Sequence, residues 1–217
     1  MNFKENRYAV VSEVIPVDIC KIATKYALIK EQCFFEPENG NDAQVPGAHS
    51  TYADTLMETL LHFLKPHMKK ITGLDLCPTY SYFRVYRPGN ELKRHKDRPS
   101  CEISTTACFG FKYNDVQEDY SWDIFVDKDS YKVSLEDNGT FVSNNQSGVA
   151  VKQGPGDLMV YRGCEIEHWR PVFEAGTGSY QVQAFFHYID KNGPYYPEFA
   201  YDRRPYLGYQ DTLKMNK

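Results

Sequence analysis

The feature that most constrains the fold is a change of pattern at Thr79. From there on, polar and apolar residues alternate in short segments separated by turn-forming residues. A period of two places successive side chains on opposite faces of a β-strand. The expected strands cover residues 79–87, 91–97, 101–112, 122–126, 131–135, 140–142, 149–151, 158–161, 165–172 and 180–188. Short strands with turn signals at intervals of roughly ten residues predict a β-sandwich or jelly roll.

The part before Thr79 is expected to be mainly helical. Residues 8–15 are apolar and β-branched, which favours an edge or lead-in strand. Residues 17–29 then place apolar side chains three and four positions apart, as on one face of a helix. The segment 33–50 is rich in Asn, Gly and Pro and is expected to be a loop.

A second helix is expected between Ser50 and Gly73. Ser50 or Thr51 is the predicted cap, Pro66 is expected to bend or restart the helix, and Gly73 to end it. No repeat or linker divides the chain, so we expect one domain over residues 1–217. Its parts are a helical lead-in at about 17–73, a jelly roll at about 79–190 and an irregular, aromatic cover at 191–217.

Composition and charge exclude several classes of protein. The 217 residues carry a net charge of −4, which argues against broad nucleic-acid binding. The six cysteines form no CxxC pair, so a zinc ribbon is not expected. The chain shows no signal-peptide pattern and no run approaching the roughly 20 apolar residues of a spanning helix. We therefore expect a soluble cytoplasmic protein with no membrane partner.

His95 and Asp97 are separated by one residue on an expected strand, so their side chains share a face. An imidazole and a carboxylate on one face are two thirds of a 2-His-1-carboxylate facial triad, which holds non-haem Fe(II) and leaves positions open. The third ligand should be a histidine on a distant strand, and His168 is the candidate. The competing interpretation is a solvated, charged edge strand.

The chain resembles the Fe(II)/2-oxoglutarate-dependent dioxygenases, in particular their prolyl-4-hydroxylase-like branch. The matching residues are Tyr82 to Gly89, Leu92, His95 to Asp97, Gly156 to Leu158, and His168 with Pro171 and Val172. The resemblance covers roughly residues 55–190, and three linked motifs occur in the family's order. It implies a double-stranded β-helix, the jelly-roll variant of this family, which agrees with the strand count.

The resemblance also implies an activity. Fe(II) would be held by His95, Asp97 and His168, with no catalytic residue beyond these ligands. 2-Oxoglutarate and O2 would occupy the open iron positions. Turnover would release succinate and CO2 and hydroxylate a C–H bond, with ascorbate as the reductant. A prolyl residue of a peptide or protein is the first substrate that the resemblance suggests.

The distal carboxylate of 2-oxoglutarate needs a cation, and here the chain departs from the family. The usual basic residue on the strand after the distal histidine is missing, because positions 176–180 read Gly-Thr-Gly-Ser-Tyr. Arg170 is the favoured replacement, since it lies two residues after His168 and a guanidinium suits a carboxylate. An ion pair with Glu165, Glu167 or Asp157 is its competing role.

Arg98 is the second candidate for that carboxylate. It follows Asp97 and faces the other way unless the strand breaks at Pro99. The polar residues expected to add hydrogen bonds to the cosubstrate are Tyr82 or Tyr86, Thr106 and Gln183.

Three alternatives remain open at this point. The substrate can be a free amino acid or another small molecule instead of a peptide. The chain can be a metal-binding protein of the cupin type without 2-oxoglutarate chemistry, or a binding domain with an idle site. The mildly acidic charge argues against a nucleic-acid substrate.

Overall fold

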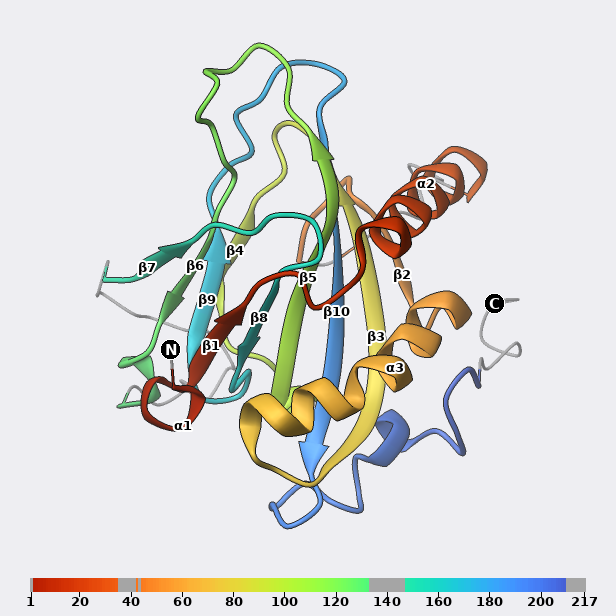
Figure 1. The fold of residues 1–217 in the computed structure, drawn as a ribbon, viewed down its shortest axis with the longest axis vertical. Coiled ribbons are helices and arrows are strands. Elements are labelled where there is room, and N and C mark those ends of the chain that lie inside the picture. Colours follow the sequence, from red (N-terminus) through yellow and green to blue (C-terminus); the bar gives the residue numbers. More distant parts are fainter. Residues whose placement is uncertain (1, 35–41, 43, 133–146, 210–217) are drawn as a thin grey trace.

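Two facing antiparallel β-sheets form the body of the protein in a computed structural model, which describes residues 2–34, 42, 44–132 and 147–209 (Figure 1). Helices cover one face of the larger sheet. This arrangement confirms the predicted jelly roll with flanking helices. The strands are β1 (Tyr8–Val11), β2 (His49–Tyr52), β3 (Leu76–Tyr86), β4 (Leu92–His95), β5 (Ile103–Lys112), β6 (Ile124–Asp127), β7 (Val149–Val151), β8 (Leu158–Tyr161), β9 (Glu167–Arg170) and β10 (Tyr180–Asp190).

The larger sheet has six strands in the order β1-β8-β5-β10-β3-β2. Its two long central strands, β3 and β10, pair antiparallel with Arg84 opposite Gln183. Alternation along β3 turns Phe83 and Val85 toward the helices and Tyr82 and Arg84 toward the other sheet. The smaller sheet has the order β4-β9-β6-β7 and forms the opposite wall.

The second helix begins later than the sequence predicted. Residues 49–52 form β2, which pairs with β3, so neither Ser50 nor Thr51 is the cap. Asp54 caps α3 (Thr55–Thr72) by accepting hydrogen bonds from the backbone N–H groups of residues 56 and 57. Pro66 lies inside this helix, which neither ends nor restarts there, and Gly73 ends it in the left-handed conformation, as predicted.

The main hydrophobic core lies between the larger sheet and the helices α2 (Val17–Phe34) and α3. Leu61 and Leu64 of α3 are fully buried against Phe83 and Val85 of β3. On α2 the buried positions are small, among them Ala23 and Ala27. Small residues let a helix approach the sheet closely, so this layer packs directly against one face of the larger sheet.

The described part of the expected C-terminal cover, residues 191–209, is mostly irregular in secondary structure. It contains the short 3-10 helix η3 (Ala200–Arg203) and contacts the body through polar side chains. Arg204 pairs with Glu58 of α3 at 2.5 Å, and Asp202 accepts hydrogen bonds from Arg98 and Tyr52.

The expected strands at 131–135 and 140–142 fall mostly outside the described residues. Within the described residues, the chain at 130–132 forms a 3-10 helix, η2 (Ser130–Lys132), and not the start of a strand. Two further short elements, α1 (Phe3–Asn6) and η1 (Pro99–Cys101), complete the described structure.

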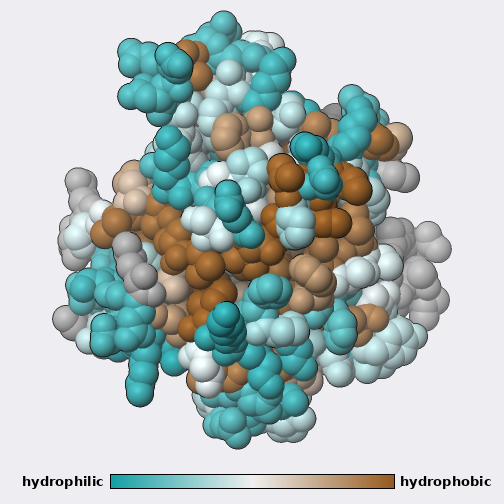
Figure 2. All heavy atoms as spheres, viewed as in Figure 1, coloured by the Kyte–Doolittle hydropathy of each residue, from teal (hydrophilic) through white to brown (hydrophobic). Residues whose placement is uncertain are grey.

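Hydrophobic side chains gather across the middle of one face, over β1 and the start of α2 (Figure 2). The outer side of α2 carries the exposed apolar residues Val17, Ile22 and Ile29, whose exposed fractions are 56%, 61% and 46%. Among the described residues, no helix combines the length and the hydropathy that crossing a membrane would need.

Candidate metal centre

His95 and His168 come from neighbouring strands and stand opposite each other in the register of β4 against β9. Asp97 follows two residues after His95, just beyond the end of β4. Its Oδ1 atom lies 3.6 Å from Nε2 of His95 and 3.5 Å from Nε2 of His168. The structure therefore brings together the three residues predicted from the sequence, with one ligand atom of each within 4.8 Å of the others.

Backbone carbonyls orient both imidazoles. Nδ1 of His95 lies 2.7 Å from the carbonyl oxygen of Lys93, and Nδ1 of His168 lies 3.3 Å from that of Ile166. A carbonyl only accepts, so each Nδ1 carries the proton and each Nε2 keeps a free lone pair. Both lone pairs point to the space beside Asp97, which is the tautomer that a metal ligand requires.

Asp97 is held by contacts from two sides. Its backbone N–H donates to the carbonyl of Gly163 at 2.9 Å, and the hydroxyl of Ser104 donates to its Oδ2 at 3.0 Å. Burial raises the pKa of Asp97, but His168 and His95, when protonated, outweigh burial through their charge and hydrogen bonds and hold the pKa well below its usual range. Asp97 is thus an ionised carboxylate with Oδ1 directed at the histidines.

The donor set fits a divalent transition metal. Two imidazole nitrogens and one carboxylate oxygen converge from one side and leave the cavity side open, as in a facial triad. A second cluster, formed by Asp97, Cys101 and His187, fits less well. Burial raises the pKa of Cys101 well above its usual value, and its sulfur lies 3.1 Å from the hydroxyl of Tyr80. A metal ligand must be a thiolate.

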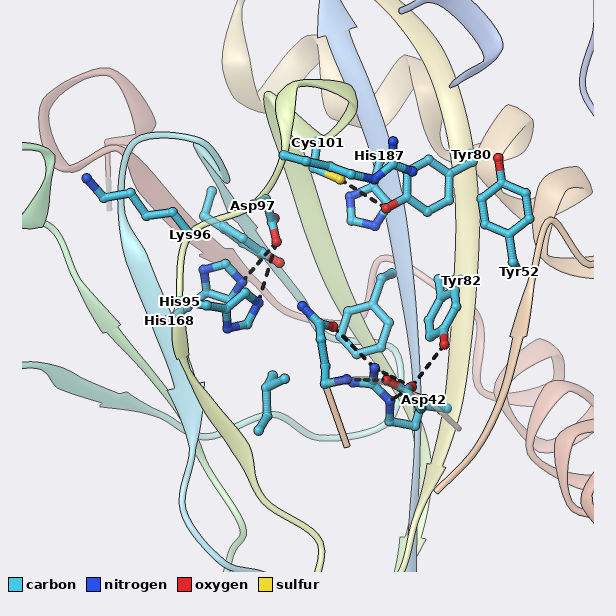
Figure 3. Close-up of a pocket in the computed structure, with 16 residues that line it drawn as sticks. Asp42, Tyr52, Tyr80, Tyr82, His95, Lys96, Asp97, Cys101, His168 and His187 are labelled. Atoms are coloured by element: carbon cyan, nitrogen blue, oxygen red, sulfur yellow. Dashed lines mark hydrogen bonds and ion pairs between the residues drawn. The ribbon is translucent and has the colours of Figure 1, made fainter. Parts of the chain in front are cut away.

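The ligands open onto a cavity of about 450 Å³ between the two sheets, a volume typical of small-molecule sites. Figure 3 shows His95, His168 and Asp97 on one wall, with Asp42 and Tyr82 across the space. The lining residues are Asp42, Gln44, Tyr52, Tyr80, Tyr82, Arg84, Leu92, His95, Lys96, Asp97, Arg98, Cys101, Tyr161, His168, Phe185 and His187.

Arg84 is a cavity residue that the sequence analysis did not single out. Its guanidinium is 2% exposed and binds Oδ2 of Asp42 through Nη2 at 2.5 Å and Nε at 2.7 Å. The predicted Tyr82 lines the same wall and donates to Asp42 at 2.9 Å. The sequence did contain a signal for Arg84. It alternates with its neighbours in step with Tyr82 and Tyr86, and this places its cationic side chain on the same, inner face of the strand.

Arg170 lies in the interior between the sheets but does not line the cavity. Its guanidinium is 1% exposed and donates to the carbonyl of Trp122 at 2.6 Å and to Oε1 of Gln153 at 3.0 Å. Among the described residues no carboxylate pairs with it. Glu165 and Glu167 pair with other arginines, and the carboxylate of Asp157 accepts backbone N–H groups.

Two buried donors near Arg170 have no acceptor within the described structure, namely its own Nε and Nε2 of Gln183. A chain of hydrogen bonds connects the two residues. Gln153 accepts from Arg170 and donates to the carbonyl of Thr106, whose hydroxyl donates to Oε1 of Gln183 at 3.0 Å. Unsatisfied buried donors are costly, so this region suits an anionic acceptor.

Arg98 and Tyr86 lie on different sides of the interior. β4 ends at His95, so Arg98 escapes the strand alternation and lines the cavity, where it binds Asp202 at 2.6 and 2.8 Å. Tyr86 is fully buried behind the cavity wall and accepts a hydrogen bond from Arg84 at 2.8 Å.

No protein-family model matches the chain, and no curated protein matches it in sequence. Solved structures do share its fold. A prolyl-4-hydroxylase from Pseudomonas putida is 15% identical with a TM-score of 0.56, over 86% of this chain and 95% of that one. The epimerase SnoN, in complex with Fe3+, alpha ketoglutarate and nogalamycin RO, is 13% identical with a TM-score of 0.67, over 96% and 90%.

HygX from Streptomyces hygroscopicus, with nickel, 2-oxoglutarate and hygromycin B bound, is 11% identical with a TM-score of 0.60, over 88% of this chain and 85% of that one. Identities this low show a common fold. The fold is the double-stranded β-helix that the sequence resemblance implied.

Proposed function

We propose that the chain is an Fe(II)- and 2-oxoglutarate-dependent dioxygenase that hydroxylates a C–H bond. The observation that carries this proposal is the convergence of Nε2 of His95, Nε2 of His168 and Oδ1 of Asp97 at the wall of one cavity. The bound metal would supply oxidative chemistry, in which 2-oxoglutarate, O2 and R–H give succinate, CO2 and R–OH. The chain's own residues hold the metal and orient both substrates.

Arg170 is the proposed partner of the distal carboxylate of 2-oxoglutarate. It is a buried guanidinium without a carboxylate partner among the described residues. Its Nε has no acceptor there, and neither has Nε2 of Gln183, which is connected to Arg170 through Gln153 and Thr106. A dianionic cosubstrate would neutralise the charge and satisfy both donors. Arg98 is the weaker candidate, because Asp202 already binds it through two hydrogen bonds.

We take a small-molecule substrate as the first candidate and the prolyl residue of a peptide as the second. A cavity of about 450 Å³ has room for a small molecule beside the metal ligands. The fold is also shared by proteins whose structures contain nogalamycin RO or hygromycin B. Prolyl hydroxylation remains the alternative, supported by the motifs around Tyr86 and His95. All six cysteines are free thiols, which supports a reducing, cytoplasmic location.

The experiment is a turnover assay on the purified full-length chain with Fe(II), ascorbate and 2-oxoglutarate. The proposal predicts formation of succinate that depends on Fe(II) and is lost in Asp97→Ala. A cupin-type protein would bind the metal without binding 2-oxoglutarate. If no 2-oxoglutarate is consumed with any candidate substrate, and none binds by calorimetry, the proposal is wrong.

A further inference from the structure

We infer that Arg84 binds a carboxylate group of the primary substrate, and that Asp42 occupies this position in the ligand-free protein. The inference rests on the proposed function, because it assigns the cavity beside His95, Asp97 and His168 to catalysis. It deepens that function by naming the substrate class, a small-molecule carboxylic acid.

The contacts of Asp42 are those of a bound carboxylate. One oxygen, Oδ2, accepts from Nη2 of Arg84 at 2.5 Å, from Nε of Arg84 at 2.7 Å and from the hydroxyl of Tyr82 at 2.9 Å. Tyr86 and Gln44 accept the other guanidinium hydrogens at 2.8 and 3.3 Å. These neighbours fix the guanidinium, so its carboxylate-binding edge is preorganised toward the cavity.

Burial makes this position selective for an anion. Arg84 is 2% exposed, so whatever displaces Asp42 must supply a negative charge or leave a buried cation unpaired. A neutral amide or an uncharged peptide residue cannot do so. A free carboxylic acid can, and it restores the same three hydrogen bonds.

Asp42 is attached to the sheet through Oδ2. Its other oxygen, Oδ1, accepts from the backbone N–H groups of Gln44 and Val45, within its own turn. Exchange of carboxylates at Arg84 would therefore break the contacts of Asp42 with β3 and leave its hydrogen bonds with Gln44 and Val45 in place.

The position of Arg84 suits a substrate that spans the cavity. Asp42 and Tyr82 lie across the open space from the metal ligands (Figure 3). Beside them the wall is aromatic, since the rings of Tyr82 and Phe185 lie 6.4 Å apart and those of Tyr80 and His187 lie 4.5 Å apart. A ligand with its carboxylate on Arg84 would place an apolar or flat body along these rings, toward the metal.

2-Oxoglutarate also carries carboxylates. The experiment must therefore distinguish a carboxylate of the primary substrate at Arg84 from a carboxylate of the cosubstrate. The full-length chain is loaded with Ni(II) and saturating 2-oxoglutarate and titrated with benzoate or with the neutral isostere benzamide in a calorimeter. We expect Asp42→Asn to tighten benzoate binding at least tenfold, because the internal competitor is lost, and to leave benzamide unchanged. The gain should vanish in the double variant Asp42→Asn/Arg84→Gln.

The matched control is Asp18→Asn, which makes the same change of charge at an exposed ion pair with Lys21 and should leave benzoate binding unchanged. Equal effects on benzoate and benzamide, or no gain in Asp42→Asn, would overturn the inference. Competition between benzoate and 2-oxoglutarate would also overturn it, since Arg84 would then serve the cosubstrate. Repeating the titration without metal and 2-oxoglutarate separates failure of this inference from failure of the proposed function.

A variant-free test covers the case that Asp42→Asn does not fold. In a crystal of the wild-type chain with Ni(II), 2-oxoglutarate and benzoate, the inference expects the benzoate carboxylate on Nε and Nη2 of Arg84 with Asp42 displaced. Asp42 in place at saturating benzoate would contradict it.

Discussion

His95 and His168 are cross-strand partners whose ring centroids lie 4.3 Å apart, and each donates through Nδ1 to a backbone carbonyl. The pairing of β4 with β9 thus sets both the spacing and the tautomer of the two imidazoles. Asp97 completes the set from the segment just after β4. A metal site built on paired strands is preorganised, because the backbone ladder holds the ligands before any metal binds.

Removing a ligand should abolish metal binding and leave the fold intact. His95 is partly exposed at the cavity wall, so His95→Ala should change the free energy of unfolding by less than about 1 kcal/mol. Fe(II) binding and Fe(II)-dependent turnover should be lost. Calorimetric titration and thermal unfolding measure the two effects. The control is His62→Ala on the exposed side of α3, which should keep both metal binding and stability.

Gly163 should control the position of Asp97 without touching the metal. A Cβ atom on this glycine would lie 2.4 Å from Oδ2 of Asp97 and 2.3 Å from the carbonyl oxygen of Cys101. Gly163→Ala should therefore displace the carboxylate and weaken Fe(II) binding roughly 10- to 100-fold, as changes behind a metal ligand do. In Gly154→Ala the added Cβ would meet its nearest atom at 3.4 Å, an ordinary contact, and Fe(II) affinity should not change.

Arg170→Met should raise the 2-oxoglutarate requirement sharply while keeping the apolar volume of the side chain. Hydrogen bonds to a charged group contribute about 1.5–3 kcal/mol, which corresponds to roughly a 10- to 100-fold higher dissociation constant. The measurement is the dissociation constant of 2-oxoglutarate for the metal-loaded protein. The control is Arg203→Met in the exposed C-terminal cover, which should leave this constant unchanged. An unchanged dissociation constant in a folded variant would move the role to Arg98 or to a set of tyrosine and threonine residues.

The pair of Asp42 and Arg84 should make stability depend on pH. Burial raises the pKa of Asp42, but the charge of Arg84 and its hydrogen bonds outweigh burial and lower the pKa below the ordinary 3.8. A carboxyl with a lowered pKa in the folded state stabilises the fold above its unfolded pKa, and this contribution is lost as the pH falls through the folded pKa.

The free energy of unfolding of the wild type should therefore exceed that of Asp42→Asn by a constant amount from pH 8 to pH 5. The difference should narrow as the pH drops below about 3.8. Urea unfolding of both proteins across this range is the measurement. A difference that stays constant down to the acid transition would show that the carboxylate charge does not contribute.

The convergence of the three candidate ligands could be predicted from the sequence because most of its signal is local. Alternation places His95 and Asp97 on a shared face, and His168 is the distant histidine that the motif order then supports. Most of the β-strands were predictable from local patterns too, such as the period of two in β3, although residues 130–132 form a 3-10 helix where a strand was expected to begin. Short β2 has no clear alternation, and it forms because β3 offers its edge to residues 49–52.

The wall opposite the metal ligands could not be predicted in the same way. Arg84 is buried only because Asp42, from a distant segment, pairs with it. Arg98 faces the cavity because β4 ends at His95, two residues before the expected end of this strand at Asp97. Such contacts depend on how separate segments pack against each other. Neither the periodicity of the sequence nor a short motif predicts them.

The most direct test of the central claim is an anaerobic titration of the purified chain with 2-oxoglutarate, with and without Fe(II). The account predicts that one 2-oxoglutarate binds per chain when Fe(II) is present, and that binding weakens drastically without the metal and in Asp97→Ala. Fe(II) binding with no effect on the affinity for 2-oxoglutarate would contradict it and leave a metal-binding jelly roll without this chemistry.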